Sequence, residues 1–252
     1  MLLAIAVVAI SILTAEVGYR VGSRSKRRED EHLRAQVTAV QASVLGLLAL
    51  LLAFGLSMAE QRFTNRREIM AAEAGAIRTT FLYADALPEP VRSQSRELLR
   101  RYVGERHAFF LATREEAPAA TARSQVTQRD LMRLATALAH EHPDWDLSAG
   151  YLDKVIEMIR LEAARELSLA ARVPRTIHVL LVAVAIVGIF VSGMAAGLVR
   201  SRTTITLYLV PLLFSLAFLV LADLDLSRVG FITTGDRPLL RLQHDLALEA
   251  GR

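Results

Sequence analysis

The sequence predicts an all-α integral membrane protein with four transmembrane helices in two hairpins and a helical extramembrane domain inserted between helices 2 and 3. Two observations carry this prediction. Four long apolar runs occur in two pairs, residues 2–19 with 37–58 and residues 177–199 with 203–222. A long charged stretch separates the pairs, and only a lipid bilayer offers so many adjacent apolar side chains a favourable environment.

The composition excludes several classes of site and partner. Hydrophobic residues make up 53% of the chain and charged residues 22%, so apolar and polar segments alternate along the sequence. With no cysteine, the chain has no disulfide, thiolate metal site or cysteine nucleophile. The net charge of +4 comes from Lys and Arg that cluster beside apolar runs. Anionic lipid headgroups attract such clusters, so we expect membrane lipids as partners and no nucleic acid.

The first hairpin occupies residues 1–58. No basic stretch precedes the run Leu2–Tyr19, and Glu16 lies near its end, which favours a retained helix over a cleaved signal peptide. A basic loop follows. The second run, Val37–Met58, is long enough at about 1.5 Å per residue to cross roughly 30 Å of hydrocarbon.

The second hairpin occupies residues 176–225. Its two runs, Ile177–Val199 and Thr203–Ala222, are separated by the short basic turn 200–202, so the helices must be antiparallel neighbours. Gly193 and Gly197 form a small-xxx-small pair that we expect to pack closely against another helix. Gly188, Ser192 and Ala196 give a second narrow face.

The inserted domain, residues 59–175, has the apolar period of helices throughout. Its first helix is expected to continue from the second membrane helix to about Ala86, before the two prolines of residues 87–90. The next spans about Val91–Thr113, and a loop is expected at Glu115–Arg123.

The third helix of this domain then ends near His140, and the fourth starts with Ser148 as its N-cap. Pro174 marks the return to the membrane, and residues 226–252 are left as a C-terminal tail.

No constellation in the chain predicts catalysis. The nucleophile elbow, the phosphate-binding loop and the dinucleotide fingerprint are all missing from the sequence, so we expect no enzyme activity, no catalytic residue and no cofactor. The cluster His140, Glu141, His142 and Asp144 has the wrong spacing for ligands on one helix face. We therefore expect a solvated loop there and no metal.

An apolar stack on the second membrane helix is the candidate pore. Leu47, Leu50 and Phe54 are three and four positions apart and share one side of a helix. They suit either an apolar constriction or ordinary helix packing. The charged residues that follow suit either rings at an aqueous mouth or an exposed face with i, i+4 pairs: Glu60, Arg62, Arg66, Arg67, Glu68 and Glu73.

Asp223 and Asp225 are acids at the end of the fourth apolar run. An ionisable residue at membrane depth costs on the order of 3 kcal/mol and needs a partner or water. Either the two acids pair with arginine, or they mark a helix end at the interface near Arg228.

Several spaced motifs resemble the bacterial bestrophin-like proteins, a membrane family with a domain of unknown function. The motifs are Leu51-Leu52-Ala53-Phe54, Glu73-Ala74 with Ala76-Ile77, Leu87-Pro88-Glu89-Pro90, Tyr102, and Leu224-Asp225 with Gly230. The resemblance runs from roughly residue 36 to residue 240. It preserves the order of two helices, a helical domain and two helices.

A more distant similarity to bestrophins proper implies an anion or cation channel assembled as a pentamer around its second membrane helix. Arg62-Phe63 matches the Arg-aromatic pair of those channels, and the apolar neck then corresponds to Gly46, Leu50 and Phe54. Gly55, Ser57 and Glu60 depart from the residues often found there. The acidic calcium clasp has no clear counterpart, so the resemblance does not imply calcium gating.

The sequence supports two functions. The first is a homo-oligomeric ion channel of the bacterial inner membrane, with Leu50 and Phe54 narrowing the pore and Arg62, Arg66 and Arg67 favouring anions at its mouth. The second is a non-conducting membrane scaffold or sensor whose helical domain binds a partner protein. The family topology places that domain in the cytosol, whereas the basic first loop favours the opposite orientation.

Overall fold

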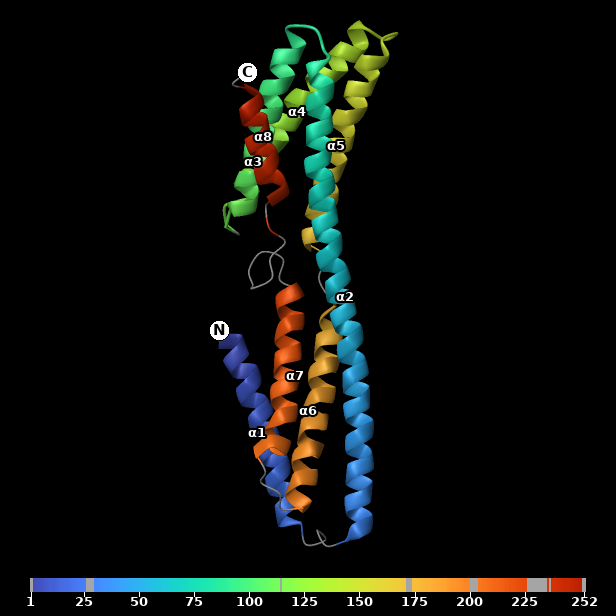
Figure 1. Ribbon diagram of the computed structural model, residues 1–252, viewed down its shortest axis with the longest axis vertical. Helices are drawn as coiled ribbons and strands as arrows, with labels where there is room; N and C mark the ends of the chain where they lie inside the picture. The colour runs from blue at the N-terminus through green and yellow to red at the C-terminus, as the bar shows by residue number, and fades with distance from the viewer. Residues whose placement is uncertain are drawn as a thin grey trace. The chain divides into compact units, whose positions relative to one another are not determined.

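The computed structural model describes residues 2–25, 30–113, 115–170, 174–199, 204–225, 235 and 237–250. These residues form helices and no strand, which confirms the all-α prediction. The helices are α1 (Leu2–Arg24), α2 (Glu31–Asp85), α3 (Val91–Leu111), α4 (Ala117–Glu141), α5 (Asp146–Ala170), α6 (Arg175–Leu198), α7 (Thr204–Asp225) and α8 (Arg237–Ala250). Figure 1 labels them along the chain.

The chain forms two compact units, and α2 contributes to both. Unit 1 consists of Met1–Phe63 and Arg172–Thr233, and unit 2 consists of Thr64–Ala171 and Thr234–Arg252. Unit 1 therefore contains α1, α6, α7 and the first part of α2. Unit 2 contains α3, α4, α5, α8 and the rest of α2.

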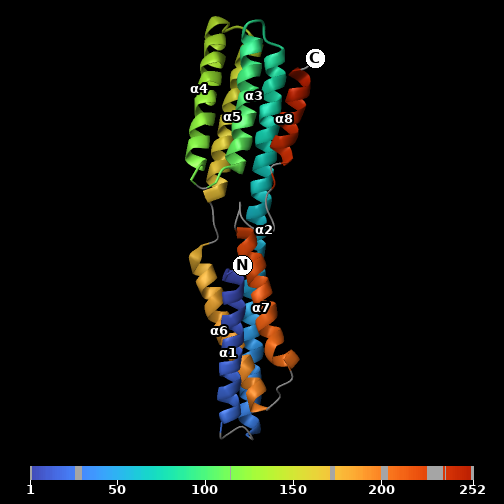
Figure 2. The ribbon, with the colours of Figure 1, turned by 90° about the vertical axis from the view of Figure 1, so that its left-hand side faces the viewer.

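In unit 1, α1 packs directly on α6 through glycines of both helices, and Figure 2 shows the two helices next to one another. A Cβ atom added to any of these four glycines would overlap backbone atoms of the other helix: Gly18 and Gly22 of α1, Gly193 and Gly197 of α6. The crossing therefore depends on the missing side chains, because the two backbones touch. The close packing at the α6 pair was predicted from the sequence, and that at the α1 pair was not.

α2 packs on the second narrow face of α6, the one that carries Gly188 and Ser192, and it also packs on α7. A Cβ at Gly188 would lie 3.3 Å from a methyl of Val44, and Gln41 Nε2 donates a hydrogen bond of 3.3 Å to Ser192 Oγ. A Cβ added at Gly55 of α2 would lie 3.4 Å from a methyl of Leu181 in α6 and 3.4 Å from a methyl of Leu221 in α7. In unit 1, one face of α2 is therefore covered by its own chain.

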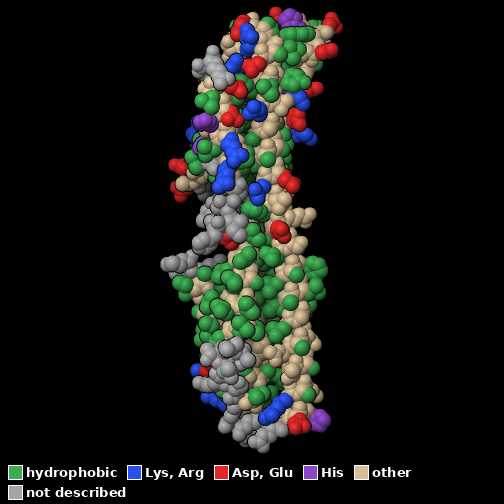
Figure 3. All heavy atoms as spheres, viewed as in Figure 1, with side chains coloured by type: hydrophobic (Ala, Val, Ile, Leu, Met, Phe, Trp, Pro, Cys, Tyr) green, Lys and Arg blue, Asp and Glu red, His purple; other side chains and the backbone are tan. Residues whose placement is uncertain are grey.

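In the described part of the chain, four helices are long and apolar enough to cross a membrane by length and composition: Ala4–Arg24, Glu31–Asp85, Thr176–Leu198 and Leu207–Leu224. Their outer side chains are largely apolar, and Figure 3 shows hydrophobic side chains spread over α1, α6 and α7. Exposed apolar area of this extent is typical of a surface that meets lipid.

Unit 2 is a helical bundle with a conventional apolar interior. Its core is formed by α2, α3, α4, α5 and α8, and the largest fully buried apolar side chains include Phe81, Leu99, Leu131 and Met158. α8 contributes Leu239, Leu242 and Leu246 to this core. Residues 237–250, treated as part of a tail in the sequence analysis, are thus a helix of unit 2.

Two helix starts differ from the expectation. α4 begins at Ala117 with Pro118 in its first turn, so the loop expected at Glu115–Arg123 is much shorter than predicted. Proline at the first helical positions lacks only an N–H that has no intrahelical partner, so it starts a helix without cost. α5 begins at Asp146, and Ser148 lies inside its first turn, where its Oγ donates to the carbonyls of His142 and Trp145.

Candidate functional site

The face of α2 opposite α6 and α7 is uncovered in unit 1. Leu50 is 53% exposed and Phe54 61% exposed, and Leu47 is also exposed. A Cβ at Gly46 would meet nothing within 4 Å. Large apolar side chains therefore project from the side of α2 that its own chain leaves bare.

Beyond the apolar run, the same side of α2 carries residues other than the predicted arginines. Glu68 follows Leu50 by five turns of about 3.6 residues, so the two share a side of α2. Arg66 lies on the opposite side. It is buried in unit 2, and its Nε donates to the carbonyl of Ser168 at 3.2 Å. Arg62 is half-buried, and Arg67 is exposed.

Both alternatives predicted for Glu73, a charge at an aqueous mouth and a place on an exposed face, are wrong. Its side chain is fully buried, and its carboxylate accepts hydrogen bonds from Arg106 Nε at 2.7 Å and from Arg165 Nη1 at 2.8 Å. Arg106 Nη1 donates to Glu162 Oε1 at 2.6 Å. Two acids and two arginines thus form a charge-balanced network inside unit 2.

Polar side chains of α3 and α4 extend this network. Gln128 Nε2 donates to the Tyr102 hydroxyl at 3.0 Å and to Glu162, and Ser124 Oγ donates to Glu162 Oε1 at 3.3 Å. The Phe109 ring lies 5.0 Å from the Arg106 guanidinium. The network therefore connects α2, α3, α4 and α5 and fixes their register.

Burial and charge act in opposite directions on the groups of this network. Burial lowers the pKa of Arg106, but the carboxylates of Glu73 and Glu162 act against burial, and the resulting pKa is raised. Burial raises the pKa of the Tyr102 hydroxyl. Arg106 therefore stays charged and Tyr102 stays neutral, and the network holds its structure near neutral pH.

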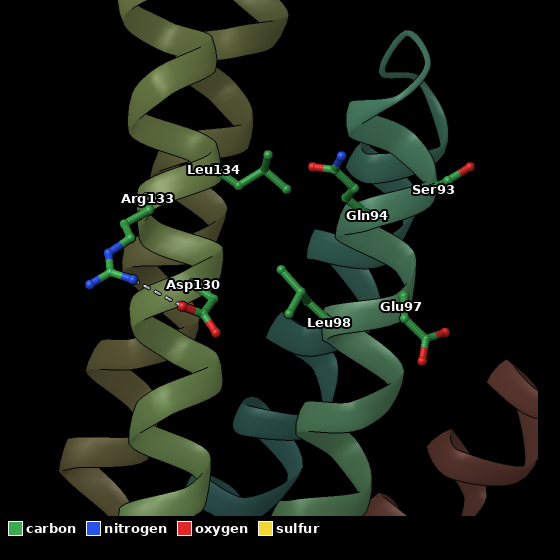
Figure 4. Close-up of a pocket in the computed structure, with 7 residues that line it drawn as sticks. All are labelled: Ser93, Gln94, Glu97, Leu98, Asp130, Arg133 and Leu134. Atoms are coloured by element: carbon green, nitrogen blue, oxygen red, sulfur yellow. Dashed lines mark hydrogen bonds and ion pairs between the residues drawn. The ribbon is translucent and has the colours of Figure 1, made fainter.

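Two of the grooves on the surface of unit 2 have both acidic and basic side chains in their linings. One lies between α3 and α4 and is lined by Ser93, Gln94, Glu97, Leu98, Asp130, Arg133 and Leu134 (Figure 4). Arg133 is bound to Asp130 at 3.3 Å, so its charge is compensated. The other lies between α2 and the start of α8 and is lined by Thr64, Arg67, Glu68, Met70, Ala71, Gly235, Arg237, Pro238 and Arg241.

The remaining predicted site residues are not joined into a site. Asp223 lies near the end of α7 and is partly buried, while the side chain of Asp225 and residue 228 lie outside the described residues. No group of three metal-ligating side chains occurs in the described part of the chain. His140 and Glu141 belong to the end of α4, not to a loop as expected, and Trp145, which follows that end, packs on the core of unit 2 with its ring 5.6 Å from that of His142.

Sequence reasoning missed the buried network, although one signal was available. Arg106 occupies the same helical stripe as Leu99, Tyr102, Val103 and Phe109, all of which are buried. A charged residue inside an apolar stripe predicts a buried ion that needs partners. Its partners, Glu73 and Glu162, come from two other helices, α2 and α5, and spacing within α3 could not identify them.

Comparison with known proteins identifies the family model that this chain matches and the solved structures that share its fold. The model for the bestrophin-like domain matches residues 5–228. A single-site variant of a bacterial bestrophin homolog from Klebsiella pneumoniae superposes with a TM-score of 0.71 at 15% identity, covering 99% of this chain and 97% of that chain.

A second crystal structure, of a variant membrane protein, gives a TM-score of 0.70 at 14% identity, with 100% of both chains covered. Another variant of the Klebsiella pneumoniae homolog gives 0.68 at 15% identity, covering 98% of this chain and 99% of that chain. No curated protein matches the sequence.

Proposed function

The chain belongs to the bestrophin-like family and is a membrane protein, and from this premise we propose that it forms a homo-oligomeric ion channel lined by α2. In this proposal, α1, α6, α7 and the first part of α2 are four membrane spans in two hairpins. Unit 2 lies outside the hydrocarbon on the cytosolic side of the bacterial inner membrane. The predicted assembly is a pentamer with α2 nearest the axis.

One observation carries the proposal, namely the uncovered apolar face of α2. If this face met lipid, α2 would be an ordinary peripheral span of a monomer. In a ring of subunits, the same face encloses an axis, and Leu50 and Phe54 form a hydrophobic constriction that gates by excluding water. The polar Gln61 and Glu68, on the same side of α2, then lead out of the constriction.

The sign of the conducted ion depends on charges beyond the constriction. The expected anion preference now rests mainly on Arg67, because Arg66 is buried against Ser168. Glu68 opposes it, because its carboxylate is exposed on the side of α2 that carries Leu50. We propose anion preference, with Arg67→Gln lowering the anion-to-cation permeability ratio and Glu68→Gln raising it.

Ion flux from liposomes tests the proposal. Purified protein is expected to pass ions, and Phe54→Ala is expected to increase the flux because it widens the constriction. Leu212→Ala, which removes an exposed apolar side chain from α7, is the matched control and should leave the flux unchanged. Vesicles that stay impermeable with both the natural protein and Phe54→Ala would contradict a channel.

A non-conducting scaffold or sensor is the second candidate, favoured by the groove between α3 and α4 (Figure 4). A partner protein bound there needs no pore and no ring. Native mass measurement of the detergent-solubilised protein separates the two candidates. A five-fold assembly supports the channel, and a monomer or dimer supports the scaffold.

A further inference from the structure

The groove between α2 and the start of α8 gathers positive charge from two distant parts of the sequence. Arg67 comes from α2, while Arg237 and Arg241 come from the first two turns of α8. Glu68 is the only acid among the described residues that line this groove. Neither Arg237 nor Arg241 forms an ion pair with any residue in the described part of the chain. No described acid therefore compensates the charges of Arg237 and Arg241.

The groove between α3 and α4 has the opposite balance of charge, with more acids than arginines in its lining. There, Glu97 and Asp130 face a single arginine, Arg133, which is bound to Asp130. Arginine guanidinium groups present several donors in a plane and match the oxygens of a phosphate. Thr64, at the edge of the α8 groove, adds a hydroxyl donor.

The groove also lies close to the apolar part of α2 along the same helix. Arg67 follows Glu60, the first charged residue after the apolar run, by seven positions, or about 10 Å of helix. The headgroup layer extends roughly 5–8 Å beyond the hydrocarbon on each side. A long arginine side chain can reach that layer by extending along the helix.

We propose that the groove formed by Arg67, Arg237 and Arg241 binds the phosphate group of an anionic phospholipid headgroup. The occupant is a lipid and not a free phosphate, because Arg67 lies only about 10 Å along α2 from the end of the apolar run, within reach of the headgroup layer. Binding at this site does not depend on ion conduction.

Native mass spectrometry of the full-length protein in detergent tests the proposal, with phosphatidylglycerol and phosphatidylcholine of the same acyl chains as probes. We expect the protein to bind phosphatidylglycerol preferentially. The Arg237→Gln/Arg241→Gln double variant should weaken phosphatidylglycerol binding about 25-fold, or about fivefold for each basic residue. The matched double variant Arg129→Gln/Arg160→Gln removes the same charge from exposed positions on α4 and α5 and should bind as the natural protein does.

Two further arms separate the alternatives. Glu68→Gln should tighten phosphatidylglycerol binding, because it removes the one described carboxylate of the groove. Inorganic phosphate at equal concentration should not displace the lipid. Equal losses in both arginine double variants would mean that only net charge matters, and displacement by inorganic phosphate would mean a free-anion site. Either result would overturn the proposal.

Discussion

The two units of this protein place the same kinds of residues in opposite positions. In unit 1, large apolar side chains such as Leu50, Phe54 and Leu212 point outward, and the closest contacts inside are between helix backbones at glycines. In unit 2, apolar side chains such as Leu99 and Met158 fill the interior. The difference follows from the surroundings. Burying an apolar side chain lowers the free energy when the alternative is contact with water, but hardly when the alternative is contact with lipid.

The polar interiors differ in the same sense. Unit 1 uses weak contacts between small groups, such as the 3.3 Å hydrogen bond from Ser215 Oγ to Ser11 Oγ. Unit 2 buries two acids and two arginines that form ion pairs with one another. A buried ion network adds less stability than its number of bonds suggests, but losing one partner leaves the other ions uncompensated.

The largest effect is therefore expected from Glu73→Ala in unit 2. It leaves Arg106 and Arg165 without their shared carboxylate, and we expect a loss of about 3–5 kcal/mol in the free energy of unfolding. The fluorescence of Trp145, the single tryptophan, reports on this unit. Glu97→Ala removes an exposed carboxylate and is the control. Equal stability of the two variants would show that the network does not hold unit 2 together.

A smaller effect is expected in unit 1 from Gly193→Ala. The added methyl would overlap the backbone of α1 at Ala15, so we expect a loss of about 1–3 kcal/mol. Gly46→Ala adds the same methyl group, which has no atom within 4 Å, so this variant should be as stable as the natural protein or slightly more stable. Thermal unfolding in detergent, followed by circular dichroism, measures both. If Gly46→Ala proved as harmful as Gly193→Ala, the close crossing of α1 and α6 would not be the source of stability.

High pH should weaken unit 2 selectively. Burial raises the pKa of Tyr102 and of Tyr151, whereas unfolded tyrosine ionises near pH 10. As the pH rises above about 10, the unfolded state loses these protons first. Stability is therefore full below about pH 10 and falls above it by up to about 1.4 kcal/mol per pH unit for each tyrosine.

Urea unfolding followed by Trp145 fluorescence between pH 8 and pH 11 measures this slope. Tyr102→Phe removes one of the two contributions and should give a shallower decline. An unchanged decline would show that Tyr102 does not couple to folding.

The smallest effect is expected from Arg78→Ala. Arg78 Nη1 lies 3.1 Å from Asp245 Oδ2, but both side chains are about half exposed, so water and salt screen the pair. We expect a loss below about 1 kcal/mol in the stability of unit 2, measured by the same fluorescence. A loss as large as that of Glu73→Ala would remove the contrast between exposed and buried ion pairs.

The sequence was sufficient for the features that local chemistry determines. Prolines after Ala86 and at Pro174 predicted helix boundaries close to the ends of α2 and the start of α6, and the apolar runs predicted all four candidate spans. The motifs around Phe54 and Glu73 identified the family. These signals are local, so neighbouring residues alone reveal them.

Tertiary partners could not be predicted in the same way. Glu73 was predicted to face water, at a pore mouth or on an exposed face, because it follows the span in the sequence, whereas its arginine partners come from α3 and α5. α8 was missed although Leu239, Leu242 and Leu246 recur at helical spacing, because the stripe is short. Which face of α2 is bare became visible only once α6 and α7 were in place.

The accessibility of single cysteines along α2 tests the central claim most directly, because the natural chain has no cysteine. Phe54→Cys and Leu50→Cys in reconstituted protein should react with a membrane-impermeant thiol reagent, and the reaction should change the ion flux. Leu212→Cys on α7, which is equally exposed in the single chain, should remain unreactive in lipid. If Phe54→Cys and Leu50→Cys are as protected as Leu212→Cys, the bare face of α2 meets lipid, and α2 does not line a pore.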